Sequence, residues 1–489
     1  MSTTSSSTSG SAARAWQHRA QELGQSLPPG FRFGTATSAF PIEGGARDGG
    51  RGDSVWDAFT TQPGRIVDGS NASVSSDHFN RQAEDVTLLR ELGGDTYRFS
   101  FAWPRLQPDG RGSLNADGLA FYDRLLDELL TAGISPMATL VDWDIPAALR
   151  GGWRNRDTAM RVGDYAFAVG EAFRDRIDAW LTLRAPAAVT LNGYALGSHA
   201  PGDTQLFDAL PSAHHQLLGH GLAVQALRAA DVRGQVGIAN AYSPVQAASD
   251  REEDRVFADL YDALHNRIFS DPVLLGRYPE LPEFSTELRK LAEVDPDDLR
   301  TIHQPLDFYG VDYTQPAQVA AGSGAAPPTN SRGGDSRPPA GEVGMARFPF
   351  RLQPLREFPV TGSGVANAPE FLGVTLAELQ GRYGDALPPV YVTAGASFPD
   401  TMDKWGDVTD IARIDYLAEH LSTAVQAVAP GGIAEGVDLR GFFVSSLLDG
   451  FEWAAGFTQR TGLVYVNFVD QTRTPKLSYR WLQQVLSSR

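Results

Sequence analysis

Charged side chains stand at the ends of several buried apolar runs, where polar groups are otherwise unexpected. Asp142, Arg184 and Asp312 each lie at the carboxyl end of such a run, and Glu452 follows another. A carboxyl group beside apolar walls has a raised pKa and can act as a general acid or base. An arginine can stabilise a developing oxyanion or bind a carboxylate through two hydrogen bonds. These four residues are therefore our candidates for proton-transfer chemistry.

The same residues also have structural interpretations. Asp142 and Arg184, on neighbouring segments, can pair with each other and fill space. Asp312 can satisfy backbone groups or Arg98 instead of a substrate. Both readings stay open at the level of sequence.

The elements that must position these side chains alternate in type. Strand-like runs are Phe31–Phe40, Thr96–Trp103, Ser135–Trp143, Ala179–Leu183, Gln235–Ala241, Leu306–Tyr313, Pro389–Thr393 and Gly441–Leu447. Between them lie helical patterns, such as the apolar face from Leu119 to Leu130 that Gly133 terminates. Eight repeats of strand and helix predict an α/β fold, a single closed (β/α)8 TIM barrel. An open doubly wound sheet is the alternative, but no Gly-rich dinucleotide motif follows the first strand.

Composition limits the possible partners. The 489 residues carry a net charge of −17, which argues against a nucleic-acid or anionic-membrane surface. The chain has no cysteine, and its nine histidines show no metal-site spacing, so we expect neither a metal nor a cofactor. The absence of cysteine fits a cytoplasmic protein. We expect a small-molecule substrate, and the sequence does not indicate an oligomeric state.

Two segments fall outside the barrel pattern. Residues 1–26 are predicted to form a disordered tail with a short helix over Ala15–Leu23, and Met1–Ala13 lacks the apolar region of a signal peptide. Residues 27–489 are predicted to form one domain. Within it, 319–345 is rich in Gly, Pro, Ala and Ser, which predicts a long flexible loop, either a lid over the mouth or an insertion without a role.

The chain resembles the family-one glycoside hydrolases, the retaining β-glucosidase family, from about Leu27 to Leu486. The matching motifs are Phe31-Arg32-Phe33-Gly34-Thr35-Ala36-Thr37-Ser38-Ala39, Tyr97-Arg98-Phe99-Ser100, Trp143-Asp144-Ile145-Pro146, His199-Ala200-Pro201-Gly202, Ser446-Leu447-Leu448-Asp449, Phe451-Glu452-Trp453 and Gly462-Leu463-Val464-Tyr465. The resemblance implies the barrel fold independently of the periodicity.

The catalytic pair that the resemblance implies is absent. Retaining glycosidases use two carboxyl groups about 5–5.5 Å apart. The family motif Thr-Leu-Asn-Glu-Pro reads Thr182-Leu183-Arg184-Ala185-Pro186 here, and the Thr-Glu-Asn-Gly motif reads Thr393-Ala394-Gly395, one residue shorter. The resemblance therefore predicts a divergent member in which both catalytic glutamates are lost.

The resemblance also implies changes in sugar recognition. Several family positions around the sugar ring hold other residues here, while Arg98, Trp143, Glu452 and Trp453 match the family, and Glu452 corresponds to a sugar-binding carboxylate. These changes predict a larger, less polar pocket. Its predicted lining is Pro41, Arg98, Trp143, Ala185, Tyr313, Thr314, Ala394, Ser445, Trp453 and Phe457. Core packing is the alternative for the aromatic members.

Three functions remain open at this stage. The favoured hypothesis is a repurposed, non-hydrolytic enzyme that cyclises, isomerises or dehydrates a relatively apolar, natural-product type of substrate by acid/base chemistry. The second is an inactive protein that binds a ligand or a partner. The third is a glycosidase or transglycosidase that uses displaced carboxylates.

Overall fold

The computed structural model describes residues 6–292, 295–323, 345 and 347–489. At its centre is a closed barrel of parallel strands in the order β1-β11-β10-β7-β5-β4-β3-β2. These strands are β1 Arg32–Ala36, β2 Thr96–Ser100, β3 Ser135–Val141, β4 Ala179–Arg184, β5 Gln235–Tyr242, β7 Phe308–Tyr313, β10 Val390–Ala394 and β11 Leu439–Ser445. Each lies within or beside one of the predicted runs. The (β/α)8 barrel is confirmed, and the open doubly wound sheet is wrong because β1 closes onto β11.

Side-chain alternation along the strands separates two apolar layers. One cluster fills the barrel interior and includes Met137, Leu181, Phe308, Tyr391 and Phe443. The other cluster packs between strands and helices, and it is much larger. Successive strand residues face opposite sides, so a residue's place in the register decides whether it can reach the mouth.

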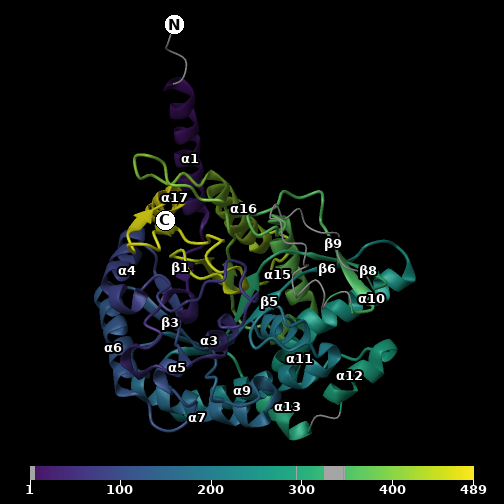
Figure 1. Cartoon of the computed structure of the whole chain (residues 1–489). Helices are drawn as coiled ribbons and strands as arrows, with labels where there is room; N and C mark the ends of the chain where they lie inside the picture. The colour runs from purple at the N-terminus through teal and green to yellow at the C-terminus, as the bar shows by residue number, and fades with distance from the viewer. Residues whose placement is uncertain (1–5, 293–294, 324–344, 346) are drawn as a thin grey trace.

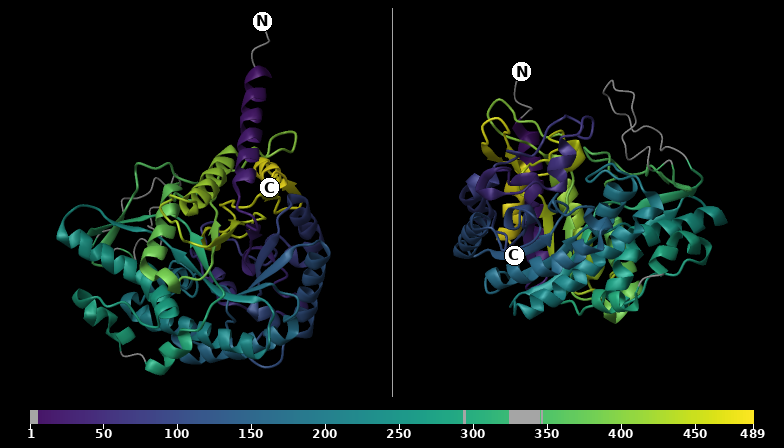
Figure 2. Two further views of the ribbon diagram at one scale, coloured as in Figure 1. Left: turned by 180° about the vertical axis from the view of Figure 1, so that it is seen from behind. Right: turned by 60° about the horizontal axis from the view of Figure 1, so that its bottom comes forward.

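Helices surround the barrel in all three ribbon views (Figures 1 and 2). The longer helices around the barrel are α4 His78–Leu92, α6 Ala116–Thr131, α7 Arg156–Phe173, α9 Leu210–Ala229, α10 Glu252–Asp262, α11 Ile268–Leu275, α12 Ser285–Ala292, α13 Pro296–Ile302, α15 Glu370–Tyr383, α16 Ile411–Val428 and α17 Leu477–Ser487. Shorter ones are α2 Ala39–Ile42, α3 Val55–Thr60, α5 Trp103–Leu106 and α8 Pro186–Ala188. In α6, the middle of the predicted apolar face is buried, while Leu119 is half-buried and Leu130 is exposed. Gly133 adopts a φ of 75° just past the helix end. Within the described residues, no helix is long and apolar enough to cross a membrane.

The N-terminal segment is more helical than predicted. Helix α1 spans Ser6–Ser26, so it includes part of the segment expected to be disordered. Its last turns pack on α17, where Ala20 and Leu23 are buried and the indole of Trp481 donates to the carbonyl of Trp16 at 3.2 Å. Tertiary packing therefore supports the part of the helix that was predicted over Ala15–Leu23.

The predicted loop at 319–345 begins in regular structure. Strand β8 Ala317–Ala321 pairs with β6 Val245–Ala247 and with β9 Phe350–Gln353 in a small sheet. Residues 324–344 lie outside the described residues. A second small sheet joins β12 Val464–Val466 to β13 Arg473–Pro475, directly after β11.

A buried charge network holds the segments after β10 and β11 together. The Lys476 ammonium is fully buried and donates to Asp400 and, at 2.7 Å, to Asp449. Arg413 also binds Asp400, and Arg460 binds Asp449 at 2.6 Å. Because these segments leave the carboxyl ends of the strands, the network fixes the backbone around the barrel mouth.

Replacing the buried ammonium tests this role. We expect Lys476→Met to lower the free energy of unfolding by about 3 kcal/mol or more, because two buried carboxylates lose a cation. The matched variant Lys404→Met, at an exposed position, is expected to stay within about 0.5 kcal/mol of wild type. Denaturant unfolding measures both, and equal stability of the two variants would contradict a stabilising network.

Candidate active site

Three of the four predicted catalytic residues meet at the carboxyl ends of the strands. The Arg184 Nε donates to Asp312 Oδ2 at 2.7 Å, from the end of β4 to β7. The Arg184 Nη1 lies 3.7 Å from Asp142 Oδ2, at the end of β3. The pairing of Asp142 with Arg184 that neighbouring strands suggested is present, and Asp312 is the closer partner.

Arg98 and Ser38 extend this contact into a network across the mouth. The Arg98 Nη1 donates to Asp312 Oδ1 and to Thr393 Oγ1, each at 2.8 Å. The Arg184 Nη1 donates to Ser38 Oγ at 3.1 Å, and that hydroxyl donates to Asp142 Oδ2 at 2.6 Å. Asp312 thus binds both guanidinium groups, and the network joins strand ends from opposite sides of the barrel.

The two arginines keep Asp312 ionised. Burial acts to raise the pKa of this carboxyl, but the charges and hydrogen bonds of Arg98 and Arg184 outweigh it and lower the pKa to about 2. The pKa of Arg184 is raised, since Asp312, Asp142 and Glu452 together outweigh its burial. Asp312 is therefore an anion at neutral pH.

Glu452 has the opposite electrostatic environment. Burial raises its pKa to about 6, although the hydrogen bond from Thr461 and the charge of Arg184 act to lower it. The Thr461 hydroxyl donates to Glu452 Oε1 at 2.5 Å. Glu452 is half-buried, and it lies just before the short helical turn Trp453–Ala455 in the segment that follows β11 along the chain. Near neutral pH this carboxyl exchanges a proton readily, as a general acid or base must.

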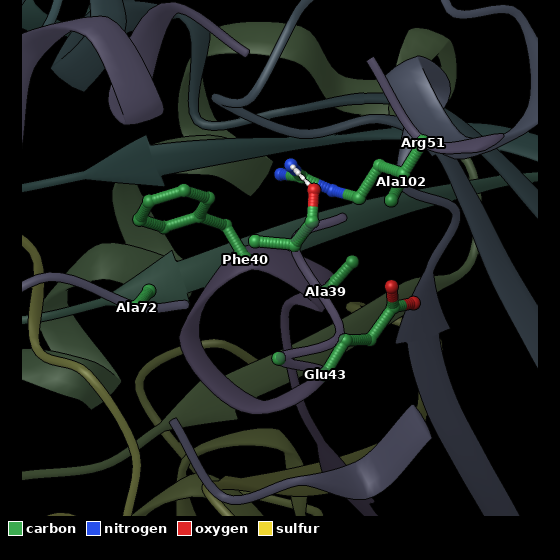
Figure 3. A pocket seen from close by; sticks show the side chains of 8 residues that line it. Ala39, Phe40, Glu43, Arg51, Ala72 and Ala102 are labelled. Atoms are coloured by element: carbon green, nitrogen blue, oxygen red, sulfur yellow. Dashed lines mark hydrogen bonds between the residues drawn. The ribbon is translucent and has the colours of Figure 1, made fainter. Parts of the chain in front are cut away.

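Two other acidic residues of the family-like motifs, Glu43 and Asp144, are buried. Glu43 accepts hydrogen bonds from Arg105 at 2.9 Å and from Tyr122 at 2.6 Å. It lines a small cavity with Phe40 and Arg51, shown in Figure 3, with room for about one water molecule. Asp144 is buried, and burial and the Asp142 charge raise its pKa well above the usual range. Among the described residues, no group of three or more His, Cys, Asp or Glu side chains is placed to hold a metal ion.

Ala394, one of the predicted lining residues, is the last residue of β10. Its neighbours in the register are Tyr313 on β7 and Val444 on β11, and all three pack in the layer between barrel and helices. Ala394 is 1% exposed. The inward position at this strand end belongs to Thr393, which pairs with Asp312 and reaches Arg98. Alternation from Tyr391, which faces the interior, is the sequence signal that could have identified Thr393.

Tyr313, another predicted lining residue, packs in the same layer between barrel and helices. Its hydroxyl donates to the Ala368 carbonyl at 2.6 Å, and its ring packs 5.7 Å from His420 of α16. Thr314, the next residue, is exposed where the chain leaves β7.

The remaining lining candidates divide between the mouth and the packing around it. Ala185 is half-buried, directly after β4, with a left-handed φ of 47°, and Ser445 is half-buried at the end of β11. Pro41 is buried, and its carbonyl accepts from the backbone of Phe451. Phe457 packs against Phe468, with ring centroids 4.3 Å apart.

Aromatic rings form one wall beside the charged network. The Trp143 and Trp453 rings lie 5.4 Å apart, and Trp56 lies 4.9 Å from Trp453. His199 stacks on Trp143 at 5.0 Å, and burial lowers the His199 pKa to about 4. His199 is therefore neutral and apolar in character, and the half-buried Trp453 offers a ring to a ligand.

Two glutamate substitutions at the end of β10 test the register. We expect Ala394→Glu to lower the free energy of unfolding by about 3 kcal/mol or more, because it places a carboxylate in apolar packing. Thr393→Glu is expected to lose clearly less, since its carboxylate faces Arg98. Ala83→Glu, on the exposed face of α4, is the control. A greater loss for Thr393→Glu than for Ala394→Glu would contradict the assignment of the two faces.

The raised pKa of Glu452 predicts a pH dependence of stability. The folded carboxyl has a pKa of about 6 and the ordinary pKa of a glutamate is 4.5, so between these pH values the folded state binds more protons than the unfolded state. Stability from this residue must then fall as pH rises through that window. We expect Glu452→Gln to remove that fall, and the exposed control Glu357→Gln to retain it. Parallel wild-type and Glu452→Gln stability curves between pH 4 and pH 7 would contradict the raised pKa.

Sequence and structure comparisons place the whole barrel in one family. The model of glycosyl hydrolase family 1 matches residues 23–489. β-Glucosidase A of Thermotoga maritima is 37% identical over 467 residues, 94% of this chain and 98% of that protein. Thermostable β-glucosidase B of Thermobispora bispora is 41% identical over 465 residues, 94% of this chain and 90% of that protein. The solved structure of a psychrophilic β-glucosidase from Micrococcus antarcticus superposes with a TM-score of 0.86 at 40% identity, covering 96% of this chain and 98% of that one.

These relatives overturn the favoured sequence-based hypothesis. A non-hydrolytic cyclase, isomerase or dehydratase of an apolar, biosynthetic substrate is wrong, and so is an inactive binding protein, because relatives 37% and 41% identical over nearly the whole chain are named β-glucosidases. The mouth is also more polar than predicted, since the Arg184 network supplies charged and hydroxyl groups there. The chain belongs to glycosyl hydrolase family 1, a family of enzymes, over its entire barrel.

Proposed function

We propose that this protein cleaves the glycosidic bond of a small-molecule β-glucoside in the barrel mouth. Glu452 donates a proton to the leaving group, and Asp312 stabilises the positive charge that develops at the anomeric carbon. The observation that carries the proposal is the charged network at the carboxyl ends of the strands, where Asp312 binds Arg98 and Arg184, in a chain that belongs to a glycosidase family. The surroundings of the two carboxyls fit these roles, since they raise the pKa of Glu452 and lower that of Asp312.

The substrate class comes from the relatives, which are named β-glucosidases. The site has suitable partners for a sugar. Asp142 accepts hydrogen bonds from Ser38 and from the backbone of Trp143, and its remaining lone pairs can accept from sugar hydroxyls. Trp453 can stack on an apolar face of the sugar or the aglycone.

The route differs from the usual double displacement. Ala185 and Thr393 carry no carboxyl group, and both oxygens of Asp312 are engaged by guanidinium groups. A carboxylate held in this way is a weak nucleophile, because its charge is already stabilised by two cations. Asp312 therefore acts electrostatically, and the acceptor attacks the anomeric carbon directly, which inverts the configuration. A water acceptor releases its proton to solvent as the new bond forms.

Aglycone release from 4-nitrophenyl β-glucoside tests the proposal. We expect wild type to release 4-nitrophenol, and Glu452→Gln to lower kcat by about 10²- to 10⁴-fold, with a smaller loss for glucosides of more acidic phenols. The rate should fall as pH rises through about 6, because Glu452 loses its proton. NMR of the first product should show α-glucose.

The matched control is Glu357→Gln, which changes the same side chain at an exposed position. We expect its kcat to equal that of wild type. The proposal fails if wild type releases no aglycone from aryl β-glucosides. The assignment of Glu452 fails if Glu452→Gln keeps the wild-type kcat and pH profile.

A further inference from the structure

The side chain of Glu452 is oriented by a single hydrogen bond within the described part of the chain. Its backbone is fixed in a turn, where its N–H donates to the Gly456 carbonyl at 2.8 Å and its carbonyl accepts from Ala455 at 3.0 Å. Its carboxyl oxygen Oε1 accepts from Thr461 Oγ1 at 2.5 Å. The Oε2 atom has no partner among the described residues and is not one of the fully buried polar atoms there. A group from solution or from a substrate therefore reaches Oε2, while Oε1 is occupied.

Thr461 is itself held in place from below. Its carbonyl accepts from Arg413 Nη1 at 3.2 Å and from the backbone N–H of Ser446 at 3.3 Å. Arg413 is 2% exposed and forms ion pairs with Asp400 and Asp410, so it belongs to the buried charge network beneath the mouth. The hydroxyl that binds Glu452 thus comes from a fixed backbone.

The proton of the Thr461 hydroxyl is directed to Glu452. A second hydroxyl, Ser446 Oγ, lies 3.3 Å away from Thr461 Oγ1, and it donates its own proton to the Leu448 carbonyl at 2.5 Å. The Glu452 oxygen is closer and carries more negative charge, so it is the stronger acceptor. Because this donor occupies Oε1, the carboxylic proton of Glu452 lies on Oε2.

We propose that Thr461 is a positioning residue that keeps the acidic proton of Glu452 on Oε2, the oxygen that a leaving group can reach. The inference rests on the function proposed above and adds to it the group that directs the acid. The proton passes from Oε2 to the aglycone oxygen, which keeps the electron pair of the bond that breaks, and solvent then restores the proton. Thr461 acts on the substrate only through Glu452.

The charges that face Glu452 come from several elements. Burial raises its pKa most, and Asp449, in the segment after β11, raises it further. The Thr461 hydrogen bond, Arg184 at the end of β4 and Arg413 on α16 lower it. Replacing Thr461 leaves burial and these three charges in place. Since a hydrogen bond to the ionised form lowers the pKa of a carboxyl, loss of this bond should raise the Glu452 pKa above about 6.

Valine and serine at position 461 separate the hydroxyl from the shape of the side chain. We expect Thr461→Val, which removes the donor and keeps the volume, to lower kcat/KM for 4-nitrophenyl β-glucoside about threefold to tenfold at pH 5. The fall of kcat/KM at higher pH should move upward by about half a pH unit or more, because Glu452 keeps its proton longer. Thr461→Ser, which keeps the hydroxyl, should retain the wild-type rate and pH profile.

Thr87→Val is the matched control, and stability gives a readout without turnover. The Thr87 hydroxyl is exposed on α4 and donates to the Ala83 carbonyl at 2.8 Å, so we expect this variant to keep the wild-type pH profile. The fall of the free energy of unfolding with rising pH should continue to a higher pH in Thr461→Val than in wild type. The reason is that the Glu452 pKa rises in the folded state and is unchanged in the unfolded state.

The outcomes separate this inference from the function on which it rests. An unmoved pH profile in Thr461→Val, with aglycone still released, would overturn the role of Thr461 and leave glucoside cleavage standing. A profile of Thr461→Ser that shifts as far as that of Thr461→Val would assign the effect to packing and also contradict the proposal. No aglycone release by wild type would overturn the proposed function and with it the catalytic role of Thr461, even where the stability curves show the shift.

Discussion

The mouth of this barrel depends on the double ion pair of Asp312. One carboxylate, on β7, binds Arg98 from β2 through one oxygen and Arg184 from β4 through the other. Neither guanidinium would be stable there alone, because a buried charge must be paired and hydrogen-bonded. Asp312 therefore fixes the orientation of two long side chains across the barrel. Through Arg184 it also places Ser38 and Asp142, so that loss of this one carboxylate would release the whole network.

The same constraint explains the division of charge in the site. Two cations close to Asp312 keep it ionised. Glu452 accepts a hydrogen bond from the neutral hydroxyl of Thr461, and its pKa is about 6. Both groups are carboxyls, and only their surroundings differ. Environment alone can thus give one of them the role of a permanent anion and the other that of a proton donor.

The barrel was predictable because its strands are short apolar runs between amphipathic helices, and each strand falls in or beside a predicted run. The charged candidates were predictable for a related reason, since a polar residue ending a buried strand must face the mouth or be paired. A motif match does not give the direction of a side chain, and alternation along β10 pairs Thr393 with Asp312 while Ala394 packs in the layer between barrel and helices.

Function was harder to predict than fold, because the two missing catalytic glutamates suggested a new reaction, while the family motifs along the rest of the chain indicated a glycosidase. The alanine at 185 removes a known route, yet removal of one route does not choose another chemistry, and similarity along the whole chain supports the glycosidase family. What the site retains is a set of donors without an internal acceptor: the Nη2 of Arg98 and the hydroxyl proton of Thr393. A protein carboxylate at this strand end would satisfy both. In the proposed route the acceptor therefore enters from solution, and Glu452 and Asp312 are the groups of the chain that act on the glucoside.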